Sequence, residues 1–281
     1  MREVISLGPA DVEGSIEVWD TLVAVNGRPV APAANLDDLL MDRAGKRTVL
    51  AVRSGALTRE AVLRPVRPAV AAGLLYRQWV NERRAYVETA SGGRLGYVHI
   101  ADMSQESSAQ LYIDLDAQNQ GKDGVVIDLR NNNGGFVNGY VLDVFTRKNF
   151  LTMTPRGLFG VPSRQGLGQR ARGSPTILVI NESSLSDAED FTEGYRHLSL
   201  GKVVGTPTAG WIIYTSGRPM LDGSVVRVPS TRIQGADGQD MEMNPSPVDL
   251  RVERQLGETL AGRGSQLDAA VAELLKGLPA R

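Results

Sequence analysis

The sequence predicts an α/β protein in which a small β-rich module precedes a mostly parallel sheet with crossover helices. From residue 96 onward, short apolar segments alternate with segments of helical length, which is typical of a parallel sheet. The first 65 residues instead alternate apolar and polar side chains around tight-turn signals. Residues 64–68 contain two prolines and mark a linker between the two patterns, because proline disfavours both helix and strand.

The β-rich module begins with an alternating segment, residues 16–25. This segment ends at Asn26-Gly27, a strong signal for a tight turn between strands. A short helix is expected near residues 35–43, and a further strand over residues 48–53. The module is therefore predicted to span residues 1–65.

An amphipathic helix is expected after the linker. Between about Val70 and Thr89, apolar side chains recur near helical spacing, with Glu and Arg between them. Linker and helix together take residues 66–95, and the α/β domain is predicted over residues 96–281.

The α/β domain is expected to alternate strands and helices and to end in a helix. The predicted strands are residues 96–100, 125–129, 177–180 and 203–204, and the predicted helices are residues 105–118, 136–146, a segment after Ser186 and a last one from Ser265. A β-hairpin is expected over residues 218–233, with its turn at Asp222-Gly223. The glycine-rich residues 157–173 are expected to form a long loop.

Composition excludes several classes of protein and of site. The 281 residues carry 31 basic and 32 acidic side chains, so the net charge of -1 offers no long-range attraction to nucleic acid or anionic lipid. The absence of cysteine excludes disulfides, thiolate nucleophiles and cysteine-ligated metal sites. No apolar run approaches the roughly 18 residues of a membrane span, and Met1–Gly14 lacks the features of a secretion signal.

The first candidate site is the loop after residues 125–129. In open parallel sheets, ligands bind at the carboxyl ends of the strands. Residues 131–135 of this loop read Asn-Asn-Asn-Gly-Gly just before a predicted helix, so backbone N–H groups without obstructing side chains can face an anion. An oxyanion hole needs such groups. The alternative is a turn in which asparagine and glycine only tolerate left-handed dihedral angles.

The second candidate site is the loop after residues 177–180. Ser186 lies at the first turn of the following helix, where the helix dipole and unpaired N–H groups stabilise negative charge. Ser186 is therefore the best-placed candidate nucleophile. The alternative is that Ser186 is only an N-cap, paired with Glu189 in a capping box.

Several segments combine in one consistent order over about residues 10–275. They are YRQWVNERRAYV at 76–87, GYVHI at 96–100, Asp128-Leu129-Arg130 with the following Asn-Gly run, Ser186-Asp187, and GKVVGTPTAG at 201–210. In this combination the chain resembles the tricorn and C-terminal processing serine peptidases. The resemblance implies a PDZ module followed by a core of the ClpP/crotonase-like α/β fold.

The resemblance also implies roles for individual residues. Ser186 stands where the family has its nucleophile, and the N–H groups of Gly134 and Asp187 would form the oxyanion hole. One sequence does not decide whether Gly134 or Gly135 presents its amide. Glu242 matches the tricorn-type acid that completes the charge relay, and its alternative is a solvent-facing glutamate in a proline-rich loop.

The sequence assigns no general base. C-terminal processing peptidases have a lysine where this chain has Trp211, which cannot accept a proton. Tricorn-type members use a histidine next to a serine upstream of the PDZ module. We expect this chain to be truncated at its start and to begin inside a partial PDZ-like module, so that it lacks that segment. Of its two histidines, His197 lies about 16 Å beyond Ser186 along a helix, and His99 falls in a predicted core strand, where a hydrogen-bonded structural histidine is more common than a base.

Three functions remain open. The first is a tricorn-type serine peptidase, the second an esterase acting on short or activated esters through the same serine, and the third a non-catalytic peptide-binding or assembly module. The expected partner is a peptide or small-ester substrate, with a homo-oligomer left open. We expect no nucleic acid, no membrane span, no cofactor and no metal.

Overall fold

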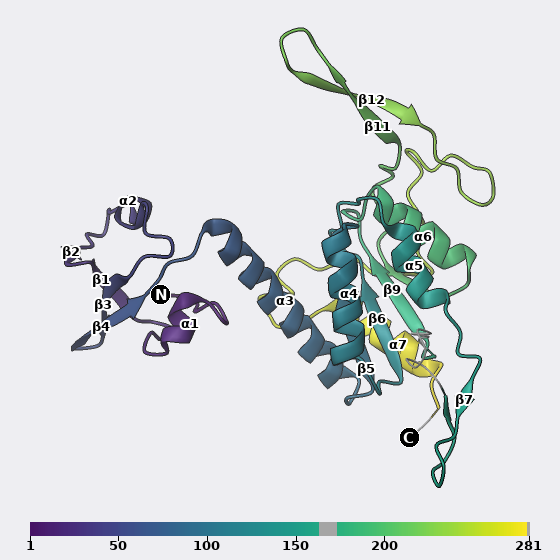
Figure 1. Cartoon of the computed structure of the whole chain (residues 1–281), viewed down its shortest axis with the longest axis horizontal. Coiled ribbons are helices and arrows are strands. Elements are labelled where there is room, and N and C mark those ends of the chain that lie inside the picture. Colours follow the sequence, from purple (N-terminus) through teal and green to yellow (C-terminus); the bar gives the residue numbers. More distant parts are fainter. Residues whose placement is uncertain (163–172, 280–281) are drawn as a thin grey trace. The chain divides into compact units, whose positions relative to one another are not determined.

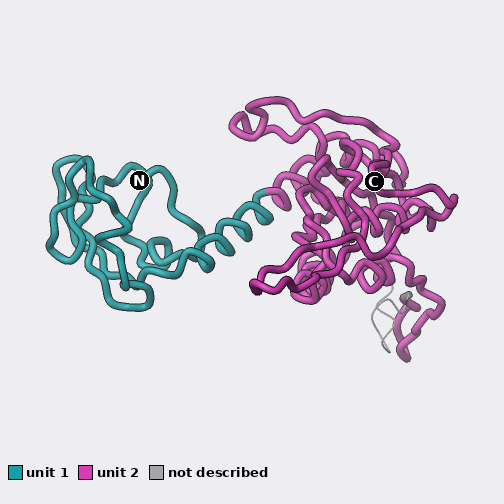
Figure 2. Tube along the Cα trace, turned by 90° about the horizontal axis from the view of Figure 1, so that it is seen from above, with its two compact units in different colours: residues 1–82 teal, residues 83–281 magenta. Residues whose placement is uncertain are grey.

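The computed structural model describes residues 1–162 and 173–279. The chain has two compact units, residues 1–82 and residues 83–281, which Figure 2 distinguishes by colour. Helix α3 (Pro68–Ala90) contains the boundary between them and corresponds to the helix expected near residues 70–89. The predicted domain limits at residues 65 and 95 remain predictions.

The first unit is built on a four-stranded antiparallel sheet in the order β2-β1-β3-β4. β1 and β2 join through Asn26-Gly27, whose φ angles of 48° and 77° are the left-handed pair that a tight hairpin turn requires. The strands are β1 (Thr21–Val25), β2 (Arg28–Pro29), β3 (Thr48–Ser54) and β4 (Leu57–Leu63), and the short helices are α1 (Pro9–Glu13) and α2 (Leu36–Leu40). This arrangement is compatible with the predicted PDZ-like module, which stays a prediction.

Sequence patterns did not predict α1 or β4. The central residues of β4 are Arg59 and Glu60, so its apolar signal is weak. Pairing with β3 along its whole length stabilises this edge strand, and Arg59 forms an ion pair with the buried carboxylate of Asp20. These contacts depend on residues distant in the chain, and a local pattern does not contain them.

The second unit is an α/β domain on a five-stranded, wholly parallel sheet, as the sequence predicted (Figure 1). The order is β13-β10-β9-β6-β5. The strands are β5 (Leu95–His99), β6 (Gly124–Asp128), β9 (Thr176–Ile180), β10 (Val203–Gly205) and β13 (Leu250–Arg251), and the helices are α4 (Gln105–Gln118), α5 (Asn138–Thr146), α6 (Asp187–His197) and α7 (Ser265–Lys276). Each helix lies within a few residues of the predicted one.

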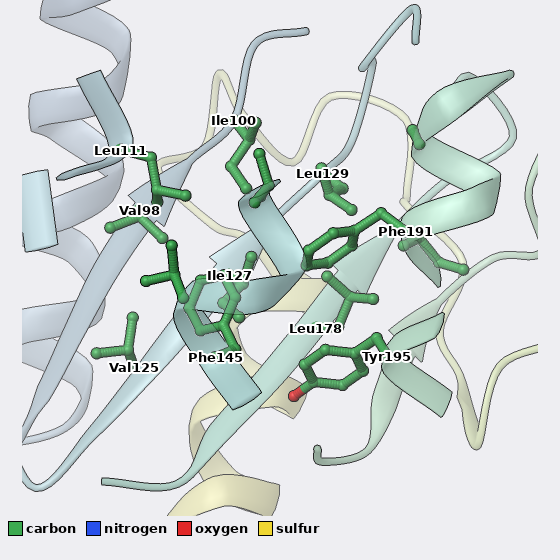
Figure 3. Close-up of a cluster of buried hydrophobic side chains, with 14 of the residues drawn as sticks. Val98, Ile100, Leu111, Val125, Ile127, Leu129, Phe145, Leu178, Phe191 and Tyr195 are labelled. Carbon is green, nitrogen blue, oxygen red and sulfur yellow. The ribbon is translucent and has the colours of Figure 1, made fainter. Parts of the chain in front are cut away.

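The main core lies between one face of this sheet and helices α4, α5 and α6 (Figure 3). Val125 and Ile127 of β6, and Leu129 directly after it, belong to this core, which follows the two-residue period of a strand. Phe191 of α6 packs edge-on against Phe145 of α5, with ring centroids 6.1 Å apart. Helix α7 contributes no residue to this core, and it contacts the strands β6, β9 and β10. Both faces of the sheet are thus covered, which explains why its strands are continuously apolar.

The remaining strands form two small hairpins. β11 (Tyr214–Pro219) pairs with β12 (Val225–Thr231), and this ribbon, predicted over residues 218–233, extends away from the α/β core in Figure 1. β7 (Thr152–Met153) pairs with β8 (Val161–Pro162). The loop expected over residues 157–173 lies largely outside the described residues.

Among the described residues, no helix combines the length and apolar character that crossing a bilayer requires. In the same part of the chain, no group of three or more His, Asp or Glu side chains is arranged to hold a metal ion.

Candidate active site

The loops that follow β6 and β9 lie side by side. The two strands are paired in parallel, so their carboxyl ends share one edge of the sheet. The amide of Asn131 donates to Asn181 Oδ1 at 2.9 Å, and Asn181 Nδ2 donates to Asn131 Oδ1 at 3.1 Å. The amide of Leu185 donates to the carbonyl oxygen of Asn132 at 3.0 Å. The segment that precedes Ser186 is therefore hydrogen-bonded directly to residues 131–135, which we call the Asn-Gly segment.

Ser186 is the N-cap of α6 and has a strained backbone, with φ of 57° and ψ of -127°. A residue other than glycine in such a region costs about 1–3 kcal/mol, and such residues cluster at functional sites. Capping does not require this conformation, since Ser104 caps α4 with φ of -95° and ψ of 167°. The predicted capping box with Glu189 is present. Ser186 is thus an N-cap, but its strain points to a further role.

Gly134 lies against Ser186 and has no room for a side chain. Its φ is 82°, and a Cβ added to it would lie 2.5 Å from Ser186 Cβ and 2.9 Å from the Asp187 nitrogen. At Gly135, an added Cβ would lie 2.0 Å from the carbonyl oxygen of Met103. The missing side chain of Gly134 keeps the space beside Ser186 and in front of the Asp187 amide open.

The backbone amides around this space differ in their partners. The amide of Gly134 donates to Asn132 Oδ1 at 2.9 Å, and Asn132 is itself buried and donates to the carbonyl of Ile100 at 2.8 Å. Within residues 1–162 and 173–279, the amides of Gly135 and Asp187 donate to no protein acceptor. The amide implied by resemblance, that of Gly134, is therefore engaged, and that of its neighbour Gly135 is open.

The Asp187 side chain holds the helix that follows the Asn-Gly segment. Its buried carboxylate accepts hydrogen bonds from the amides of Val137 and Asn138, at 2.7 and 3.0 Å, and from the side-chain amide of Asn138. The N-cap of α5, Val137, has no capping side chain of its own. Asp187 therefore caps α5 from the neighbouring helix, and its own amide is fixed in place as a result.

Hydrogen bonds connect Glu242 to Ser186 by way of the segment between β10 and β11. Its Oε2 accepts hydrogen bonds from the amides of Ile212 and Ile213, at 2.9 and 2.8 Å. The preceding residue, Trp211, accepts the Ser186 amide on its carbonyl oxygen at 2.7 Å. Glu242 is thus hydrogen-bonded beside the site, and it is not the free, solvent-facing glutamate of the alternative interpretation.

The Asn-Gly segment starts from a buried ion pair at the end of β6. Arg130 donates to the two carboxylate oxygens of the fully buried Asp128 at 2.9 and 2.6 Å, and the Tyr97 hydroxyl donates to it at 2.8 Å. Burial raises the pKa of Asp128, but the charge and hydrogen bonds of Arg130 outweigh it and hold that pKa below its usual range. Arg130 also reaches α7, donating to Gln266 Oε1 at 3.1 Å.

Comparison with known proteins identifies the family of the chain. The profile of "Peptidase family S41" matches residues 94–252, which is more than half of the chain. The chain belongs to peptidase family S41.

Within family S41 the chain is similar to tricorn proteases. It is 34% identical to tricorn protease homolog 1 of Streptomyces coelicolor over 94% of this chain and 24% of that protein. It is 30% identical to the tricorn protease of Thermoplasma acidophilum over 72% of this chain and 19% of that protein. A crystal structure of the tricorn protease superposes with a TM-score of 0.83 and 25% identity, covering 95% of this chain and 26% of that one. The predicted family and fold class are confirmed, and the chain spans about a quarter or less of the length of these relatives.

The structure describes both histidines of this S41 chain. His99 is buried in β5 and donates from Nε2 to the carbonyl oxygen of Arg130 at 3.0 Å, and burial lowers its pKa. His197 is the last residue of α6, at the opposite end from Ser186. Within the described residues, no histidine or lysine forms a hydrogen bond with Ser186. The general base of the candidate site stays unassigned.

Sequence patterns missed two features of this S41 site. Glu189 appeared only as half of a capping box, although its carboxylate accepts further hydrogen bonds from the segment that contains Trp211. Asp190, one residue further, accepts a hydrogen bond from the Tyr214 hydroxyl at 2.7 Å. A count of acidic residues at the start of α6, Asp187, Glu189 and Asp190, was the one local signal available.

Asp190 is expected to make the stability of the S41 core depend on pH. Burial, together with the negative charges of Asp187 and Glu189, raises the pKa of Asp190 to about 6, although the hydrogen bond from Tyr214 acts in the opposite direction. A carboxyl whose pKa is raised by folding stabilises the fold below its unfolded pKa of about 3.9, and this stabilisation is lost as the pH rises through about 6. The urea midpoint of the wild type, measured relative to that of Asp190→Asn, should therefore decrease as the pH is raised from 4 to 6. Parallel midpoint curves for the two proteins would contradict the assignment.

Proposed function

We propose that this chain carries the catalytic core of a serine peptidase in which Ser186 attacks the substrate carbonyl and forms an acyl-enzyme. The observation that carries the proposal is the strained Ser186 backbone next to the open Asp187 amide and the side-chain-free Gly134. Strain at an N-cap serine has no use in capping, and an exposed amide at a helix N-terminus stabilises a developing negative charge. The names of the similar relatives, all proteases, support the same reaction class.

The oxyanion hole of the proposal uses the Asp187 amide and one amide of the Gly134-Gly135 pair. The Gly135 amide is available without breaking a hydrogen bond. The Gly134 amide, implied by the resemblance, would share or release its hydrogen bond to Asn132 when substrate binds. Both glycines are required in either case, because side chains at these positions would collide with the neighbouring loops.

Glu242 is proposed as the acid that orients the base. Only its Oε2 accepts hydrogen bonds from the described residues, so its Oε1 is available to accept one from an imidazole N–H. We propose that a histidine from outside residues 1–281 provides this imidazole. Glu242 would hold it in one tautomer and stabilise its protonated form.

A missing base should affect peptides more than activated esters. Peptide hydrolysis requires the departing amine to be protonated, normally by the group that took the serine proton. A p-nitrophenolate leaves as a stable anion and needs no such proton. In a serine peptidase without its histidine, about 10³–10⁴ of rate enhancement over water remains from the oxyanion hole and binding. Slow turnover of small activated esters is therefore the activity we expect of residues 1–281.

The test is covalent labelling and ester hydrolysis. A fluorophosphonate probe should modify Ser186, located by mass spectrometry of peptides, and p-nitrophenyl acetate should be hydrolysed slowly but above background. Ser186→Ala should abolish both, at a cost in stability of about 0.5–2 kcal/mol for the lost cap.

Ser183→Ala is the matched control, since it removes a hydroxyl from the same loop. It should leave labelling and hydrolysis unchanged. Labelling that survives Ser186→Ala would place the nucleophile elsewhere, and a folded wild-type chain that is never labelled would favour the non-catalytic alternative.

A further inference from the structure

The Glu189 carboxylate is buried beside Ser186 and accepts four hydrogen bonds. Its side chain has no exposed surface. Oε1 accepts from the amides of Trp211 and Ser186, at 2.7 and 3.2 Å, and Oε2 accepts from the Thr208 hydroxyl and the Gly210 amide, at 2.6 and 2.9 Å. A capping box uses only one of these hydrogen bonds, that from Ser186. The other three need another explanation.

These hydrogen bonds join the segments that carry the candidate catalytic residues. Ser186 is the N-cap of α6, and its amide also donates to the carbonyl of Trp211 at 2.7 Å. The Thr208 hydroxyl, which donates to Glu189, accepts from the amide of Ser246 at 2.7 Å. The amide of Met243 donates to the carbonyl of Gly210 at 2.8 Å. Ser246 and Met243 both belong to the segment that contains Glu242, so these two hydrogen bonds connect that segment to residues 208–210.

The arrangement requires a carboxylate. All four partners of Glu189 donate hydrogen, and only an ionised carboxylate accepts at both of its oxygens. In glutamine, one oxygen becomes an NH₂ group that would face two donors. The negative charge also shortens and strengthens the hydrogen bonds it accepts. Charge-assisted contacts to the amides of Ser186, Gly210 and Trp211 restrain the backbone dihedral angles of the two segments that contain these residues.

Building on the proposed function, we infer that Glu189 is a positioning residue of the serine site. Its carboxylate holds Ser186 in its strained conformation and keeps the segment from Thr208 to Trp211, and with it Glu242, in register with the nucleophile. Glu189 does not contact the substrate. Its effect reaches the reaction through the placement of the Ser186 hydroxyl and of the Asp187 amide next to it.

Substitutions at Thr208 test this role while keeping Glu189 in place. Thr208→Val is nearly isosteric and removes the hydroxyl that donates to Oε2, whereas Thr208→Ser keeps that hydroxyl. Thr192→Val is the matched control: Thr192 is also buried, lies on α6, and donates its hydroxyl to the carbonyl of Ala188 at 2.8 Å, away from the cluster. The control removes one buried hydroxyl from the same helix without touching the cluster.

The first readout is the rate of Ser186 labelling by a fluorophosphonate probe, separated into its maximal rate constant and its half-saturating concentration. Thr208→Val should lower the maximal rate about 10- to 100-fold with little change in half-saturation, because small misplacements of reacting groups act on the chemical step. Thr208→Ser should restore most of that rate, and Thr192→Val should keep it. An equal loss in Thr208→Val and Thr192→Val would overturn the inference. So would a Thr208→Val protein that fails to fold while Thr192→Val folds, because the cluster would then serve the fold as a whole.

The second readout does not depend on activity. Amide hydrogen exchange at Ser186 and Trp211 should accelerate about tenfold in Thr208→Val and stay unchanged in Thr192→Val. A carboxylate that loses one of its four donors is held less firmly in place, so the hydrogen bonds of its remaining donors open more often. If wild type is never labelled but this exchange pattern appears, the proposed function fails and the positioning role stands. Unchanged exchange in Thr208→Val, with wild type still labelled at Ser186, would overturn the positioning role alone.

Discussion

Gly134→Ala is expected to abolish Ser186 labelling and to destabilise the fold. The new methyl group would lie 2.5 Å from Ser186 Cβ and 2.9 Å from the carbonyl oxygen of Leu185, and the φ of 82° is unfavourable for alanine. The dihedral strain costs about 1–2 kcal/mol and the overpacking about 1–3 kcal/mol. If the loop moves to relieve the collision, the oxyanion donors move with it, and loss of one such donor lowers turnover about 10²- to 10³-fold.

The measurements are the urea unfolding curve and the labelling rate of the same preparation. Gly139→Ala is the control, because it makes the same change in α5, where an added Cβ meets nothing within 4 Å. Alanine in a helix should stabilise that variant by about 0.5–1 kcal/mol and leave labelling intact. A Gly134→Ala protein with wild-type labelling would show that the space beside Ser186 is not where the substrate carbonyl binds.

Arg130→Met is expected to cause the largest loss of stability. It leaves the carboxylate of Asp128, which is fully buried, without its cationic partner, and it removes the hydrogen bond to Gln266 of α7. Breaking a buried ion pair from one side costs about 3–5 kcal/mol, a large part of the total stability of a domain. Because Arg130 directly precedes the Asn-Gly segment, the labelling of Ser186 should fall as well.

Unfolding by urea at pH 7 measures this loss. Arg232→Met provides the control: it removes the same type of side chain from an ion pair with Asp240 that is largely exposed, with 68% of the Arg232 side chain accessible. Exposed pairs are screened by water, so this variant should unfold at the wild-type midpoint. Equal midpoints for both variants would mean that Asp128 is neutral or is compensated by Tyr97 alone.

Sequence patterns identified most elements of the second unit because each of them is encoded locally. The strands of the parallel sheet are short apolar runs, and helices such as α4 and α7 open at serine or glycine with an acidic first turn. Strands at the edge of a sheet, such as β4, were harder to predict from the sequence. The residues of β4 contain a charged centre, and the strand forms because β3 offers a partner along its whole length.

The candidate nucleophile was also open to prediction, for a topological reason. Two glycines before one helix and a serine before another are local signals, and parallel strands bring the ends of their following loops to one edge of the sheet. The combination of these signals in order carried the family resemblance, which the comparison with S41 peptidases confirms.

The sequence by itself therefore determined the fold class and the family, and it indicated the two loops of the candidate site. Only the tertiary structure decided how that site is held. Glu189 lies three residues after Ser186, but three of its four donors come from Thr208, Gly210 and Trp211, and Asp187 caps a helix that begins at Asn138. The physical reason is range: periodicity and capping act over a few residues, whereas a buried carboxylate is satisfied by donors that the fold brings to it from distant parts of the chain.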